Sequence, residues 1–204
     1  MKIAFCLLQC GISPNDIEDF SEENLKIIEK LAIKEKVVAI GEIGLDYYWN
    51  KENKDTQKEL FIKQIEIANK LNLPIVIHTR DATLDSIQIL KEHSVTKKGV
   101  FHCCPLNQEL IKAGLELGFY ISFSGNITFK NAKSHDVVSL VPMDRILIET
   151  DSPYLSPEPY RGKRNDSSKV KLVAEKIAEI KGMSLKEVAM ITYENANKIF
   201  NLEA

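Results

Sequence analysis

Four residues that could bind a metal ion lie at the ends of short apolar runs. Glu42 follows Val37 to Gly41, His78 follows Leu73 to Ile77, His102 follows Gly99 to Phe101, and Asp151 ends the run that begins at Arg145. Pro153 stops this last run, which predicts that Asp151 lies at the carboxyl end of a strand. In folds of parallel strands and helices, the loops at the carboxyl ends of the strands converge on one crevice. We therefore predict that the four side chains share a site.

Imidazole and carboxylate ligands together suit a borderline divalent ion such as zinc or manganese. An open coordination position on such an ion could hold a reactive water molecule. Each residue also has an ordinary structural interpretation, because a histidine at a strand end can bond a neighbouring carbonyl and an acid there can cap the next helix. The recurrence of ligand types on successive strands favours the shared metal site.

A basic loop follows Asp151 closely in the sequence. Tyr160-Arg-Gly-Lys-Arg164 gathers three positive charges around a glycine. Arg161 and Arg164 could form bidentate hydrogen bonds with phosphate oxygens, although the composition also fits a solvated loop. Arg80 could bind the same anion or pair with a neighbouring aspartate. A substrate that carries phosphate is the functional interpretation of both features.

Three consecutive aromatic residues, Tyr47, Tyr48 and Trp49, follow the run that contains Glu42. They could stack on nucleobases, but aromatic side chains beside a core more often pack against it. We therefore expect packing for all three.

The chain alternates strand-like and helix-like segments without a proline-rich or serine-rich linker, which predicts a single α/β domain over residues 1–204. Strands are expected at Lys2–Gln9, which should be buried on both faces, and at Val37–Gly41, Pro74–Ile77, Gly99–Phe101, Phe119–Ser122 and Ile146–Thr150. Helices are expected from Glu22 to Lys34 with Ser21 as the cap, from Thr56 to Leu71, after Asp81 as a cap, after Asn107, and twice near the end, where Ser184 and Glu187 form a capping box. About six strands are fewer than the eight that close a β/α barrel.

Composition narrows the functional classes. The net charge of -2 excludes a protein surface that is basic throughout and binds nucleic acid in that way, so any polyanion must bind to a local basic patch. The apolar amino terminus, Met1 to Leu8, is too short to span a membrane, and we expect no membrane association. Four cysteines without a C-x-x-C pair favour a reduced, cytoplasmic setting.

Several segments resemble the TatD family of metal-dependent deoxyribonucleases, in the amidohydrolase superfamily. They are Gly41-Glu-Ile-Gly-Leu-Asp-Tyr-Tyr48, Leu73-Pro-Ile-Val-Ile-His-Thr-Arg-Asp-Ala82, Val100-Phe-His-Cys103, Gly118-Phe-Tyr-Ile-Ser122, Ile127-Thr-Phe-Lys-Asn-Ala132, Glu149-Thr-Asp-Ser-Pro-Tyr-Leu155 and Pro159-Tyr-Arg-Gly-Lys-Arg-Asn165. The likeness runs from about Gly11 to the end of the chain.

The resemblance implies a TIM-type β/α barrel with a site for two divalent ions, zinc, magnesium or manganese, that hydrolyses DNA phosphodiester bonds, often from a 3′ end. It implies that Glu42 bridges the two ions, that His78 and His102 hold one, and that Asp151 binds the other, with Glu42 and Asp151 catalytic. Arg80, Tyr154 and Arg161 would then face the substrate phosphate.

The chain departs from the family pattern at its amino-terminal side. No His-x-His pair occurs, Ser13 stands where the family has a histidine, and the segment after His102 is altered. We expect an incomplete barrel that lacks two strand-helix units ahead of Met1, with weakened activity and one metal site poorly formed. The strands Lys2–Gln9 and Ile146–Thr150 would be exposed edges that promote self-association.

Two other functions remain open from the sequence. One is a metal-dependent amide or lactone hydrolase on the same scaffold, for which the basic loop would not be needed. The other is an inactive remnant that still binds metal or nucleic acid, which the missing His-x-His pair favours.

Overall fold

The computed structural model describes residues 7–49 and 51–202, which form two compact units. The first unit comprises the described residues up to Val100 together with Ile199–Asn201, and the second comprises Phe101–Lys198 and Leu202.

Six strands give the described chain its α/β character. They are β1 (Leu8–Cys10), β2 (Val37–Asp46), β3 (Ile75–Arg80), β4 (Gly99–Phe101), β5 (Tyr120–Phe123) and β6 (Ile146–Ile148). The strand order follows the chain, β1-β2-β3-β4-β5-β6, and β1 with β2, β2 with β3, and β5 with β6 pair in parallel. The predicted fold class, with six strands in place of the barrel's eight, is confirmed. β1 and β6 end the strand order, and self-association through them stays a prediction.

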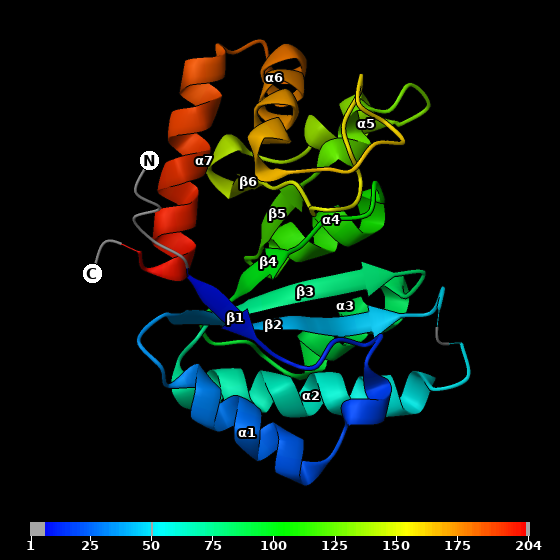
Figure 1. Ribbon diagram of the computed structural model, residues 1–204, viewed down its shortest axis with the longest axis vertical. Helices are drawn as coiled ribbons and strands as arrows, with labels where there is room; N and C mark the ends of the chain where they lie inside the picture. Colours follow the sequence, from blue (N-terminus) through cyan, green and yellow to red (C-terminus); the bar gives the residue numbers. More distant parts are fainter. Residues whose placement is uncertain (1–6, 50, 203–204) are drawn as a thin grey trace. The chain divides into compact units, whose positions relative to one another are not determined.

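Three helices cover the strands of the first unit. They are α1 (Glu22–Ala32), α2 (Lys54–Leu71) and α3 (Thr83–Glu92). Helices α1 and α2 lie side by side against the sheet (Figure 1) and bury Leu25, Phe61 and Ile65. The Ser21 hydroxyl accepts a hydrogen bond from the Asn24 amide, so the predicted cap of α1 is confirmed.

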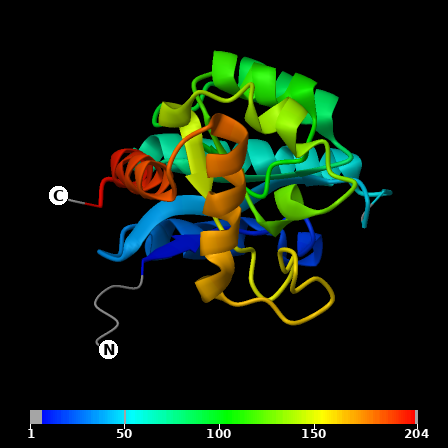
Figure 2. The same ribbon diagram turned by 90° about the horizontal axis from the view of Figure 1, so that it is seen from above.

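The second unit carries the remaining helices. They are α4 (Gln108–Glu116), α5 (Ser134–Val138), α6 (Val170–Lys181) and α7 (Leu185–Phe200), with 3-10 turns at Gly125–Thr128, Met143–Arg145 and Ser167–Lys169. Asn107 caps α4, and Ser184 and Glu187 exchange the two bonds of a capping box, as predicted. A long loop, drawn yellow to orange, connects β6 with α6 (Figure 2). No described helix is long and apolar enough to cross a membrane.

Two strands run further than the sequence predicts. The expected end of β2 at Gly41 is wrong, because the strand shifts register between Ile40 and Ile43 and then continues to Asp46. In this extension Gly44 pairs with His78, and a Cβ on Gly44 would lie 2.1 Å from the His78 carbonyl oxygen. Only glycine permits so close an approach. The pairing that this contact allows extends β3 to Arg80. Glu42 and His78 therefore lie within strands.

Two smaller expectations are also wrong. Asp81 adopts a positive φ of 54°, and the N-cap of α3 is Ala82. The prediction that Asp81 caps this helix is therefore wrong. Leu8 is 50% exposed, so the expectation that its strand is buried on both faces is wrong for this residue. Residues 2–6 of that predicted strand lie outside the described residues.

We expect Gly44→Ala to destabilise the protein by more than about 3 kcal/mol, because the new methyl group must displace the His78 carbonyl at a φ of +135°. Urea unfolding would measure the loss. Gly182→Ala is the matched control, since Gly182 also has a positive φ but nothing within 4 Å of its Cβ position, and it should cost about 1 kcal/mol. Equal losses in the two variants would contradict the role of close approach.

Candidate metal centre

In the first unit, the ring of His78 lies between two carboxylates. Its Nδ1 is 2.7 Å from Glu42 Oε1, and its Nε2 is 2.9 Å from Asp46 Oδ2. β2 carries both acids and β3 carries the histidine. Burial lowers the pKa of His78, but hydrogen bonds to Glu42 and then Asp46 outweigh it, so this pKa lies above its ordinary value.

Asp46 is the fixed member of this group. Its side chain is almost fully buried, and Oδ1 accepts hydrogen bonds from the backbone amides of Tyr48, at 2.9 Å, and Trp49, at 3.0 Å. The side chain of Gln57 bonds both the Asp46 amide, at 2.8 Å, and the Asp46 carbonyl, at 3.1 Å. Burial alone would raise the pKa of Asp46, but the Trp49 amide and the bonds to His78 and Tyr48 lower it below the ordinary value. Asp46 is therefore a rigid anion.

The charge of Asp46 decides which nitrogen of His78 can bind a cation. An ionised carboxylate only accepts hydrogen bonds, so Nε2 of His78 must carry a proton. When the ring is neutral, its lone pair is therefore on Nδ1, the nitrogen that bonds Glu42 while the ring is protonated. A carboxylate that holds one ring nitrogen while the other binds the ion is the usual support of a metal-binding histidine.

The second unit repeats this design with the ring nitrogens exchanged. His102 Nδ1 is 2.8 Å from Glu149 Oε2, and its Nε2 is 3.5 Å from Asp151 Oδ1. The Cys103 backbone amide donates to Glu149 Oε1 and fixes this carboxylate. Because Glu149 holds Nδ1, the lone pair of His102 is on Nε2, which faces Asp151.

A buried asparagine fixes the segment after β6. Asn165 is 3% exposed, and its Nδ2 donates to the carbonyls of Thr150 and Tyr154, each at 2.7 Å. The Asn165 amide also donates to the Pro153 carbonyl, at 3.0 Å. These bonds hold both sides of the turn in which Asp151 adopts a φ of 55°. Asp151 is therefore placed by a residue fourteen positions later in the chain.

The residues expected at a phosphate are exposed. The Arg80 guanidinium lies 3.8 Å from the ring centroid of Tyr48, and Asp85 instead pairs with Lys58, so no pairing of Arg80 with Asp85 forms. Arg161 lies 4.2 Å from the centroid of Phe129, and Tyr154 is 72% exposed.

The structure thus brings the predicted ligands together in pairs, Glu42 with His78 in the first unit and His102 with Asp151 in the second. Sequence reasoning missed the supporting residues Asp46, Glu149 and Asn165. Strand alternation could have found Asp46, because residues four apart in a strand share a face and Asp46 is four after Glu42. No local pattern signals the role of Asn165.

The family model described as TatD related DNase matches residues 2–201 of the chain. The chain belongs to the TatD family. An uncharacterized metal-dependent hydrolase of Bacillus subtilis, YabD, is 50% identical over 200 residues, which cover 97% of this chain and 78% of that protein. The Escherichia coli protein YcfH, of the same description, is 46% identical over 97% of this chain and 75% of its own length. The crystal structure of YJJV, a TatD homolog from Escherichia coli, superposes with a TM-score of 0.91 at 27% identity and covers 96% of this chain and 77% of that one.

Membership of the TatD family makes this chain one of a family of metal-dependent hydrolases, and the local chemistry fits a divalent ion. Each unit holds an imidazole nitrogen beside a carboxylate oxygen, and these are donor types that such ions take. The fixed carboxylates Asp46 and Glu149 give each histidine the required tautomer.

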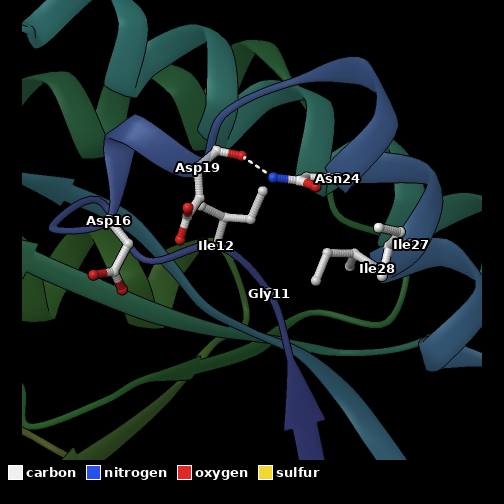
Figure 3. Close-up of a pocket in the computed structure, with 7 residues that line it drawn as sticks. All are labelled: Gly11, Ile12, Asp16, Asp19, Asn24, Ile27 and Ile28. Atoms are coloured by element: carbon white, nitrogen blue, oxygen red, sulfur yellow. Dashed lines mark hydrogen bonds between the residues drawn. The ribbon is translucent and has the colours of Figure 1, made fainter.

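A pocket of about 290 Å³ lies elsewhere in the first unit of this TatD-family chain (Figure 3). It is lined by Gly11, Ile12, Asp16, Asp19, Asn24, Ile27 and Ile28, and Asn24 Nδ2 donates to the Asp19 carbonyl at 2.8 Å. None of the predicted site residues lines it. We assign the pocket no part in the metal chemistry.

We expect Asp46→Asn to weaken divalent-metal binding by roughly 10- to 100-fold. The amide oxygen can still accept from Tyr48 and Trp49, but the amide nitrogen then donates to His78 Nε2 and forces the proton onto Nδ1. Calorimetric titration of the metal-free protein with zinc or manganese would measure the change. Asp136→Asn, at an exposed position of α5, is the matched control and should bind as the unchanged protein does. Equal affinities in both variants would refute the tautomer argument.

Proposed function

We propose that this chain hydrolyses phosphodiester bonds of DNA in a divalent-metal-dependent reaction and acts from a 3′ end. The observation that carries the proposal is the position of Arg80, whose exposed guanidinium ends the same strand that presents His78. Side chains at two-residue spacing share a face of a strand, so a phosphate held by Arg80 would lie near the His78 and Glu42 donors. A neutral amide or lactone would not require such a cation.

We assign Glu42, His78, His102 and Asp151 to hold the metal ions, with Glu42 shared between two of them as the family resemblance implies. Zinc, manganese or magnesium would fit these donors. When bound, such ions polarise the phosphoryl group and activate water. The 204 residues contain no His-x-His pair, so the ion on the Asp151 side has few donors from this chain. We therefore propose that activity depends steeply on added magnesium or manganese.

Three site residues contact the substrate phosphate, and Asp151 also handles the proton of the attacking water. Arg80 and Arg161 bind phosphate oxygens through their forked donors, and the Tyr154 hydroxyl donates to the same group. Asp151 accepts the proton of the attacking water, because an anionic carboxylate is an acceptor. DNA is thus the proposed partner, bound by local cations on a chain whose net charge is -2.

We propose a cytoplasmic location. Its support is that the three cysteines within the described residues, Cys10, Cys103 and Cys104, are free thiols. Burial raises the pKa of Cys104, which keeps this thiol protonated and unreactive.

The His78→Ala, His102→Ala double variant should retain less metal than the unchanged protein, because it loses both imidazole donors. Metal analysis of the two purified proteins after dialysis against zinc or manganese measures the difference. The matched control is His93→Ala, His135→Ala, which removes two histidines outside the site. Equal metal content in all three proteins would exclude the proposed ligands.

Digestion of a 3′-labelled single-stranded DNA tests the reaction itself. We expect cleavage that requires added magnesium or manganese and that falls by about 100-fold or more in Asp151→Ala, the range for loss of a group that transfers a proton. Arg161→Ala should raise KM and leave metal content unchanged, since phosphate contacts mainly position the substrate. The control Lys171→Ala removes an exposed cation on α6 and should leave KM unchanged. Absence of cleavage at any metal concentration would overturn the proposed function.

A further inference from the structure

We propose that Trp49, supported by Tyr48 and Arg80, stacks on an unpaired nucleobase of a single-stranded nucleic acid. These three residues are called the aromatic platform. The inference rests on the proposed function and names the form of substrate that the site accepts. It also revises the expectation that all three consecutive aromatic residues pack against the core, because only Tyr47 is buried, at 7% exposure.

The platform presents flat, exposed surfaces. Tyr48 is 46% exposed and Trp49 is 66% exposed, and their rings meet edge to face with centroids 4.8 Å apart. The Arg80 guanidinium covers the face of Tyr48 at 3.8 Å and lies 5.6 Å from the Trp49 centroid. A single exposed ring needs no explanation, but Tyr48 and Trp49 form one contiguous exposed aromatic surface, and such surfaces mark binding sites.

Buried hydrogen bonds fix the backbone beneath the platform. Asp46 Oδ1 accepts from the amides of Tyr48 and Trp49, and the Tyr47 amide donates to the Arg80 carbonyl at 2.9 Å. The Tyr47 hydroxyl donates to Asp85 at 2.7 Å, which holds the segment against α3. The platform backbone is therefore ordered before any ligand binds, which reduces the entropy cost of binding.

The chemistry of the platform matches a nucleotide. Trp49 offers a large π surface, and stacking on such a surface tolerates any base because every base has a π face. Among residues 7–49 and 51–202, the Arg80 guanidinium makes no hydrogen bond or ion pair, so its donors can take a phosphate oxygen while its plane stays on Tyr48. Bases within a duplex already stack on their neighbours, so the platform selects a single strand or a frayed end.

One carboxylate links the platform to the metal ligands. Asp46 bonds the Tyr48 and Trp49 amides through Oδ1 and His78 through Oδ2. A base on Trp49 would therefore lie at a fixed offset from the His78 and Glu42 pair. Stacking would place the attached phosphate relative to those donors, so the platform positions substrate as well as binding it.

Trp49 is the sole tryptophan of the chain, so its fluorescence reports directly on stacking. The experiment titrates metal-free protein, in chelator, with an oligothymidylate and with an abasic deoxyribose phosphate strand of equal length. We expect quenching by the oligothymidylate and little by the abasic strand. A fully paired duplex should also quench weakly. Equal quenching by the abasic strand would show that phosphate alone is bound and would overturn the proposal.

Substitution separates stacking from charge. Trp49→Ala should weaken binding of a dye-labelled oligothymidylate, measured by anisotropy, by roughly 5- to 150-fold, the range that one base stacked on an aromatic side chain supplies. Tyr193→Ala, which removes an aromatic ring that is 63% exposed on α7, is the matched control and should bind as the unchanged protein does. Equal binding by Trp49→Ala and the unchanged protein would overturn the platform. Because both assays are metal-free, quenching by a chain that cleaves no DNA would refute the proposed function and leave the platform standing.

Discussion

The Asp46 carboxylate is the interaction on which the candidate site of the first unit depends. It is almost fully buried, and it stays ionised because the Trp49 and Tyr48 amides and the His78 ring all donate to it. A buried charge with fewer donors would be costly and would take up a proton. The same bonds set the tautomer of His78 and the course of the chain beneath Trp49. The proposed metal donors and the proposed stacking surface therefore share one support.

The second unit orients its histidine with different residues. Glu149 bonds His102 as Asp46 bonds His78, and Asn165 fixes the turn that contains Asp151. In both units a histidine lies between a carboxylate that backbone amides hold and a carboxylate that can bind an ion. This repetition argues for a metal role more strongly than any of the residues taken singly, because a structural histidine needs one partner and not two.

Membership of the TatD family and the local geometry support each other at different levels. The family relation makes the chain part of a group of metal-dependent hydrolases, and the paired donors explain in physical terms why a divalent ion suits it. The step from hydrolase to nuclease rests on the exposed arginines and on the aromatic platform, which favour a substrate with both phosphates and bases.

The amino-acid sequence was enough to predict the family, the α/β class and the candidate ligands, because these depend on residue type and local spacing. It also determined the helix starts at Ser21, Asn107 and Ser184, since a capping side chain bonds amides within its own first turn. The lengths of β2 and β3 could not be predicted in this way, because the contact of Gly44 with the His78 carbonyl joins segments that are distant in the sequence. The roles of Asp46 and Asn165 and the exposure of Trp49 likewise depend on groups brought together by folding. Local spacing carries no information about such long-range partners.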